Sequence, residues 1–163
     1  MKMGEKGYFM KRLLVFLIFL LPSMVSAASV DNLPTAADFQ RDAQVSKEQH
    51  IPIMVFYMAD DCPYCEAVSE LYLEPMHRNG LDKGRFILRT VKLDGSDYMR
   101  GFYGRKMRQE DFANQQGISF TPVIRIYDYR GFQLVPEIFG YQTPELYGGY
   151  LDSAIDKSIA KLR

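Results

Sequence analysis

The stretch that decides the fold is PIMVFYMADDCPYCE, residues 52–66. It joins a continuous run of apolar and aromatic residues to two cysteines that flank Pro63 and Tyr64. An apolar run of this length is typical of a central strand that is buried on both faces. The chain has no other cysteines, so Cys62 and Cys65 form a structural staple, half of a metal site or a redox centre.

The small number of possible metal ligands and the short separation of the two cysteines argue against a metal site and against a purely structural disulfide. A zinc site usually needs four ligands, and the two histidines of the chain, His50 and His77, lie on separate segments. A staple between Cys62 and Cys65 would close a very short loop, and stabilisation by loop closure is smallest for short loops. The pattern therefore favours a redox centre and predicts no metal.

The cysteines lie where a predicted strand is followed by a predicted helix. Pro63 suits the first helical turn, because the N–H that it lacks would have no partner there. Unpaired backbone N–H groups and the helix dipole favour a thiolate at Cys62, whereas the negative charges of Asp60 and Asp61 oppose it. Cys62 is expected to be exposed and to attack, and Cys65, one turn below, to resolve the mixed disulfide.

Residues 1–27 are predicted to be a signal peptide. Basic residues precede the apolar core LLVFLIFLLP, and the small residues of SMVSAAS allow cleavage near Ala27. The apolar core is about half the ~20 residues needed to cross a bilayer, and an uncleaved anchor is the alternative. Cleavage would leave a periplasmic domain, residues 28–163, whose only membrane contact was the signal peptide. A disulfide can persist in that compartment.

Length and charge narrow the class of protein further. The 163 residues suggest one domain, and 47% hydrophobic and 25% charged residues are ordinary values for a folded protein. The formal net charge is zero, so no basic field points to nucleic acid as a partner.

The chain outside the signal peptide alternates predicted helices and strands. Helices are expected over roughly 35–48, from about Pro63 with an interruption at Pro75, over 108–118, and from about Thr143 with Leu146, Tyr150, Leu151, Ile155 and Ile159 inward. Strands are expected over 52–58, 85–94, 123–127 and 132–139, and segment 95–107 is expected to be a loop. This order predicts an α/β fold with a mixed central sheet and helices on both faces. The first two strands should be parallel and the last two an antiparallel hairpin.

The strand IPIMVFYMADD, the motif CPYC and the later stretch SFTPVIRIYDYRG together resemble the thioredoxin superfamily. The resemblance covers nearly all of residues 35–160, and in detail it is similar to exported thioredoxin-like proteins found with sulfur-oxidation systems. It implies a thioredoxin-like fold in which Cys62 is the nucleophile of a redox-active disulfide and Cys65 is the resolving thiol. It also implies that Pro122 is a cis-proline beside the cysteines and that Thr121 makes strand-like contacts to substrate. A proline that merely begins a strand is the alternative.

Some positions depart from the pattern of the superfamily. Asp61 stands where most thioredoxins have tryptophan, and Phe56 stands where they have a buried aspartate, so proton transfer at Cys65 needs another route. Lys92 matches a lysine near the active site of the superfamily, where it could tune the thiols, or it is a surface residue. The Pro-Tyr dipeptide between the cysteines also occurs in glutaredoxins. The export signal argues against a glutathione-binding site, and so does the absence of the glycine pair that glutaredoxins carry after the hairpin.

Segment 95–107 leaves the carboxyl end of a predicted parallel strand, the end at which α/β folds bind ligands. The cysteine motif leaves the same end of the neighbouring strand. We therefore expect Arg100, Phe102, Tyr103 and Arg105 to border the active site and to recognise a partner, with a solvated or self-packed loop as the alternative.

These features predict an exported thiol–disulfide oxidoreductase that reduces disulfides of periplasmic proteins. No organic cofactor is expected, because the disulfide itself carries the electrons. The resemblance implies protein disulfides as substrates and a membrane thiol protein as electron donor. The alternatives are a disulfide-forming oxidase or isomerase, and a non-catalytic peptide-binding or chaperone module.

Overall fold

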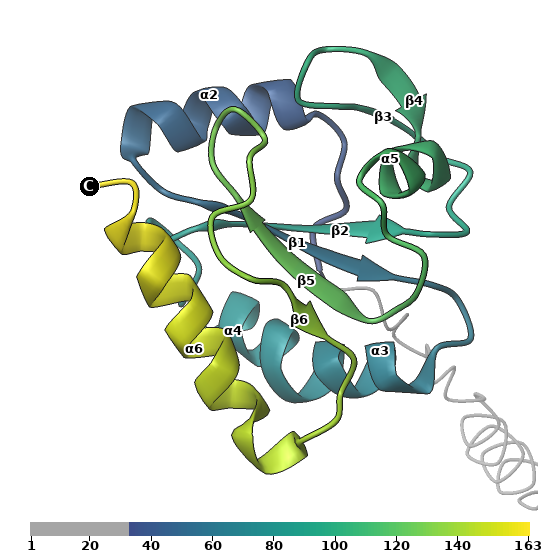
Figure 1. The fold of residues 1–163 in the computed structure, drawn as a ribbon, viewed down its shortest axis with the longest axis vertical. Helices are drawn as coiled ribbons and strands as arrows, with labels where there is room; N and C mark the ends of the chain where they lie inside the picture. The colour runs from purple at the N-terminus through teal and green to yellow at the C-terminus, as the bar shows by residue number, and fades with distance from the viewer. Residues whose placement is uncertain (1–32) are drawn as a thin grey trace, which may run out of the picture. The chain divides into compact units, whose positions relative to one another are not determined.

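The structure, a computed structural model, describes residues 33–163; the predicted signal peptide and its cleavage site near Ala27 lie outside the described residues. A mixed sheet in the order β2–β1–β5–β6 forms its centre, with α2 and α5 on one face and α3, α4 and α6 on the other (Figure 1). The strands are β1 Ile53–Met58, β2 Ile87–Lys92, β5 Val123–Tyr127 and β6 Ile138–Phe139. The predicted fold class is confirmed.

Strand β1 is buried on both faces. Every residue from Ile53 to Tyr57 has a relative exposure of 0%. Met54 and Phe56 pack into one core with Cys65, and Val55 and Tyr57 pack into a second core on the opposite face. Burying each large apolar side chain contributes about 1.5–3 kcal/mol, so both cores hold β1 at the centre of the sheet.

The register of the sheet places the ends of the first two strands together. Strand β1 pairs with β2 in parallel, from Ile53 opposite Ile87 to Met58 opposite Lys92. On its other side it pairs with β5 in antiparallel fashion, and β5 pairs likewise with β6. Both predicted strand directions are confirmed.

Helix α2, Phe39–Gln49, begins at Asp38, whose carboxylate accepts hydrogen bonds from the backbone N–H groups of Gln40 and Arg41. The helix lies against the second core through the fully buried Phe39. Aspartate is among the residues that cap helix N-termini best, because its carboxylate satisfies N–H groups that have no partner within the helix.

The helix after the cysteines is interrupted as predicted. It runs as α3 Pro63–Val68, a π-helical segment Ser69–Leu73, and α4 Glu74–Arg78. Pro75 has no N–H to donate to the carbonyl four residues earlier, and its ring would crowd that carbonyl. The wider π-helical turn just before Pro75 accommodates both effects.

The remaining helices are α5 Gln109–Gln115 and α6 Pro144–Ala160. The buried face of α6 consists of Tyr147, Leu151, Ile155 and Ser158. The prediction that Leu146 and Tyr150 point inward is wrong, since they are 53% and 52% exposed. Successive residues of a helix point about 100° apart, so Leu146 and Tyr150 are rotated away from the buried residues Tyr147 and Leu151 that follow them.

No helix within residues 33–163 combines the length and apolarity needed to cross a bilayer.

Segment 95–107 is a hairpin and not a loop. Strands β3 Tyr98–Arg100 and β4 Lys106–Arg108 pair in antiparallel fashion. Only the central residue of each strand, Met99 and Met107, is buried. Strands of three residues are too short to show the alternation from which a strand is predicted.

Strand β6 is much shorter than the predicted 132–139. Its register sets Ile124 opposite Ile138, which would place Pro136 opposite Ile126. Proline has no N–H for the ladder, and the N–H of Leu134 donates to the Ile126 carbonyl instead, at 2.8 Å. The ladder is therefore broken around Pro136.

Burial of Tyr147 makes stability depend on pH in alkaline solution. Burial raises the pKa of Tyr147 well above the usual value, so the folded protein keeps a proton that the unfolded chain releases near pH 10. The free energy of unfolding is therefore expected to fall as pH rises above 10, by about 1.4 kcal/mol per pH unit for this group.

Tyr147→Phe should make the free energy of unfolding fall less steeply with pH, by about 1.4 kcal/mol per pH unit, which corresponds to one proton. The free energy is measured by urea unfolding between pH 9 and 11. Tyr150→Phe, at a half-exposed position of the same helix, is the matched control for the loss of a tyrosine hydroxyl from α6. Equal slopes for Tyr147→Phe and the unmodified protein would contradict the prediction.

Candidate active site

Cys62 and Cys65 form a disulfide at the start of α3. Cys62 caps the helix, and its sulfur accepts a hydrogen bond from the backbone N–H of Cys65 at 3.2 Å. Cys62 is half-buried, whereas Cys65 is 1% exposed. An incoming thiol or disulfide can therefore reach Cys62 and not Cys65.

The turn before Cys62 depends on Asp61. Its φ of 53° lies in the left-handed region, which aspartate tolerates better than most residues with a side chain. The turn takes the chain from the end of β1 directly into the capping position. Pro63 and Tyr64 follow it at the surface, and Tyr64 is 63% exposed.

Thr121 and Pro122 lie beside the cysteines. The peptide bond between them is cis, and the hydroxyl of Thr121 donates to the sulfur of Cys62 at 3.4 Å. Pro122 is buried, and its carbonyl accepts a hydrogen bond from the N–H of Gly140 at 2.8 Å. Cys62, Cys65, Thr121 and Pro122, which carry the resemblance to the thioredoxin superfamily, therefore lie together in the structure.

Lys92 forms an ion pair with Asp60. The ammonium lies 2.8 Å from a carboxylate oxygen of Asp60, and the backbone N–H of Asp60 donates to Asp94 at 2.9 Å. The carboxylate of Asp60 is 69% exposed, so the pair contributes only about 0–1 kcal/mol to stability. Its main effect is to neutralise part of the negative charge that precedes Cys62.

Cys65 lies in apolar surroundings. It belongs to the same core cluster as Met54, Phe56 and Val68, and the position of the aspartate usual in thioredoxins is filled by the fully buried Phe56. A low-polarity site favours the neutral thiol over the thiolate. Cys65 therefore lies among core side chains, below the more accessible Cys62.

Sequence reasoning missed an exposed aromatic pair next to this site. The rings of Phe120 and Phe139 stack with centroids 5.5 Å apart, and both side chains are 49% exposed. Phe120 directly precedes Thr121 in the sequence, which was the signal that could have found it. Phe139 comes from β6 and could be placed only with the strand register.

The expectation that Phe102 borders the active site is wrong. Its ring stacks on Phe39 with centroids 4.8 Å apart and contacts Tyr127. It also lies so close to Gly131 that an added Cβ there would be 2.8 Å from the ring. Tyr127 pairs with Ile53, the first residue of β1, so Phe102 packs at the end of β1 opposite to the cysteines.

The other hairpin residues are held by neighbours at the same distant end. Arg100 forms an ion pair with Asp38 at 3.3 Å, and Arg105 donates to Gln115 at 3.3 Å. Tyr103 is 78% exposed. The hairpin lies beside α5 with its turn at the start of α2, on the opposite face of the sheet from α3 (Figure 1), so the prediction that these residues border the active site is also wrong.

The arrangement is suited to thiol–disulfide exchange. An accessible sulfur at a helix start and a shielded sulfur within bonding reach allow one to attack and the other to resolve. Within residues 33–163, no three His, Cys, Asp or Glu side chains gather in a way that could hold a metal ion.

Comparisons with known proteins identify the fold. The thioredoxin-like domain family matches residues 39–155. The structure of Fasciola hepatica thioredoxin is 14% identical with a TM-score of 0.52, over 77% of this chain and 99% of that chain. A DsbH oxidoreductase structure is 19% identical with a TM-score of 0.54, over 84% of this chain and 92% of that chain. No curated protein sequence matches the chain significantly, and the link to sulfur-oxidation systems stays a prediction.

The charge of Asp61 should slow the reaction of Cys62. Asp61→Asn removes a negative charge one residue away and keeps a side chain that tolerates the left-handed region. Reduced protein carrying this change should alkylate with iodoacetamide about two- to four-fold faster at pH 7, because a thiolate is less disfavoured.

Asp152→Asn, on the exposed face of α6, is the matched control and should not change the rate. The effect should shrink at high salt, since exposed charges are screened. An unchanged or slower rate for Asp61→Asn would show that this carboxylate does not act on Cys62.

Proposed function

The chain belongs to the thioredoxin-like domain family and carries the CxxC disulfide of a thiol–disulfide oxidoreductase; from this premise we propose that it reduces disulfides of exported proteins. One observation carries the proposal. Cys62 is accessible and receives hydrogen bonds from the Cys65 N–H and the Thr121 hydroxyl, whereas Cys65 is buried directly below it. This difference assigns the two sulfurs different tasks.

The reaction begins from the reduced protein. The thiolate of Cys62 attacks one sulfur of the substrate disulfide, which breaks that bond and forms a mixed disulfide with Cys62. The other substrate sulfur leaves as a thiolate and takes up a proton from solvent. Cys65 then loses its proton and attacks the sulfur of Cys62, which releases the second substrate thiol. The substrate gains two electrons and two protons, and Cys62 and Cys65 end as a disulfide.

The residues around Cys62 support the reducing direction. A strong oxidant needs an unusually stable thiolate, because stabilising the reduced form makes the disulfide a better electron acceptor. Here the hydrogen bonds to the sulfur come from one backbone N–H and one neutral hydroxyl. The carboxylates of Asp60 and Asp61 add negative charge nearby, of which only Asp60 is paired with Lys92.

Export is the second part of the proposal. The basic and apolar pattern of residues 1–27 supports secretion to the periplasm with cleavage near Ala27. An oxidising compartment would convert the dithiol to the disulfide, so a membrane thiol protein would have to supply electrons continuously. Labelling of accessible thiols in intact cells, before and after release of the periplasm, would test the location and the resting redox state together.

Insulin reduction in the presence of dithiothreitol tests the activity. The unmodified protein should accelerate precipitation of the insulin B chain, and Cys62→Ser should abolish the acceleration because the attacking sulfur is lost. A rate that is the same with and without Cys62 would leave only a binding or chaperone role.

Cys65→Ser is the matched variant, since it removes the resolving sulfur and keeps the attacking one. It should accumulate a mixed disulfide with substrate through Cys62, visible as a mass shift that disappears on reduction. Accumulation through Cys65 in the Cys62→Ser variant instead would reverse the assigned order of the cysteines.

A further inference from the structure

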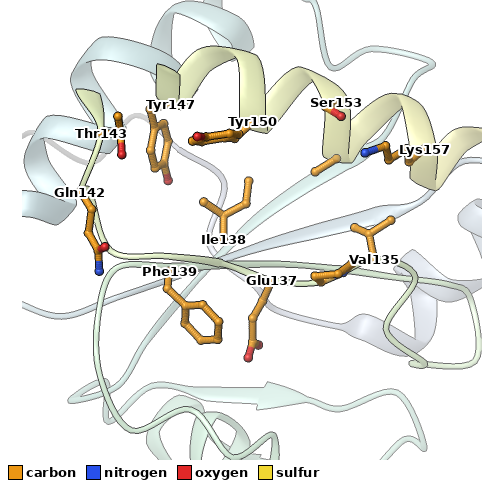
Figure 2. Close-up of a pocket in the computed structure, with 12 residues that line it drawn as sticks. Val135, Glu137, Ile138, Phe139, Gln142, Thr143, Tyr147, Tyr150, Ser153 and Lys157 are labelled. Atoms are coloured by element: carbon orange, nitrogen blue, oxygen red, sulfur yellow. The ribbon is translucent and has the colours of Figure 1, made fainter. Parts of the chain in front are cut away.

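A groove of about 480 Å³ lies between α6 and the chain that contains β6 (Figure 2). Its lining includes Val135, Ile138, Tyr147, Tyr150, Ser153 and Ala154. Figure 2 shows Val135 and Ile138 pointing toward α6, whereas Glu137 and Phe139 point away from it. The groove is therefore apolar at its base and open beside the strand.

The outer edge of β6 faces solvent next to this groove. Within residues 33–163, β6 is the last strand of its sheet and pairs with β5 alone. The N–H of Gly140 donates to Pro122, and Val123 lies opposite Phe139. Because the two edges alternate along an antiparallel strand, the backbone N–H and C=O of Phe139 point outward, away from β5. An exposed edge of this kind is a template for another extended chain.

Side-chain contacts link the edge of β6 to the active site. Phe139 stacks on Phe120, and Phe120 precedes Thr121, whose hydroxyl contacts the sulfur of Cys62. Strands lie about 4.8 Å apart and a strand rises about 3.3 Å per residue. A strand added outside β6 would lie three strand spacings from β1, roughly 14 Å, so a chain that leaves Cys62 would need about four extended residues before it lies beside Phe139.

We propose that an extended segment of the substrate protein adds to the outer edge of β6 while its cysteine reacts at Cys62. The inference rests on the proposed function and names how that site selects its substrate. Backbone hydrogen bonds to Phe139 would hold the segment, and every second side chain would enter the groove against Ile138 and Tyr147. Preferred substrates therefore carry apolar residues at alternate positions, beginning about four residues from the reactive cysteine.

The backbone contact is tested by a pair of variants at one position. Phe139→Pro removes the ring and the outward N–H, whereas Phe139→Ala removes the ring and keeps the N–H. Proline is tolerated on an edge strand where its N–H would face solvent. The substrates are synthetic peptides whose cysteine disulfide is followed or preceded by eight residues with alternating valine and threonine, compared with oxidised glutathione.

The unmodified protein should show a lower KM for one of the two extended peptides than for a peptide without the extension. Phe139→Pro should raise that KM about five-fold above the value for Phe139→Ala, the amount expected for one lost hydrogen bond. Equal KM values for the two variants would overturn the role of the backbone edge.

The groove is tested with separate variants, because Phe139→Pro could misfold. The test of whether the substrate segment occupies the groove then does not depend on that variant. Ser153→Trp places a large side chain into the groove, and Asp152→Trp places the same side chain on the exposed face of α6. Ser153→Trp should lower the ratio of kcat/KM for the extended peptide to that for oxidised glutathione at least five-fold. Asp152→Trp should leave the ratio unchanged, and equal ratios for both variants would overturn the inference.

Failure of this inference is distinguishable from failure of the proposed function. If the unmodified protein reduces oxidised glutathione and insulin but gains nothing from either extension, the substrate segment does not use the groove and the proposed function stands. If it reduces no disulfide at all, the proposed function fails and the inference fails with it. Light scattering that shows a dimer, dissociated by Ser153→Trp, would assign the edge to a second copy of this chain and would also overturn it.

Discussion

The burial of β1 on both faces is the constraint from which the rest of the structure follows. Residues that are apolar on successive positions can be shielded from water only between two cores, and β1 is fully buried from Ile53 to Tyr57. That burial fixes the position of the end of β1 and the direction in which the chain continues beyond it. The turn at Asp61 and the cap at Cys62 come within four residues of its end. The reactive sulfur thus lies four residues beyond the end of the most completely buried strand of the fold.

The chemistry of the site differs from its relatives at the positions that surround this strand. An apolar Phe56 replaces the carboxylate that thioredoxins place below the second cysteine, so Cys65 has core residues beneath it. The carboxylates lie instead above Cys62, at Asp60 and Asp61, with Lys92 against the first of them. Thioredoxins thus have a carboxylate on the buried side of the disulfide, whereas this protein has its carboxylates on the solvent side. This placement opposes a very stable thiolate at Cys62 and supports the reducing direction.

The sequence predicted those elements whose pattern is local, and missed those that depend on distant partners. The long apolar run, the Pro-interrupted helix after Cys65 and the parallel pairing of β1 with β2 follow from periodicity and connection rules. The break in β6 follows from Pro136 standing opposite Ile126, which is known only once the register is known. The position of Phe102 is set by stacking on Phe39, more than sixty residues away. The groove beside α6 likewise exists only where two such elements meet.

The equilibrium reduction potential of the Cys62–Cys65 pair tests the central claim most directly. It can be measured from the fraction of reduced protein in glutathione buffers of known ratio, separated after alkylation. We predict a value near that of thioredoxin, about −270 mV, because the donors to the Cys62 sulfur are neutral and two carboxylates lie close by. A value near −120 mV, typical of the strongest oxidants of the superfamily, would contradict it and would assign this protein to disulfide formation.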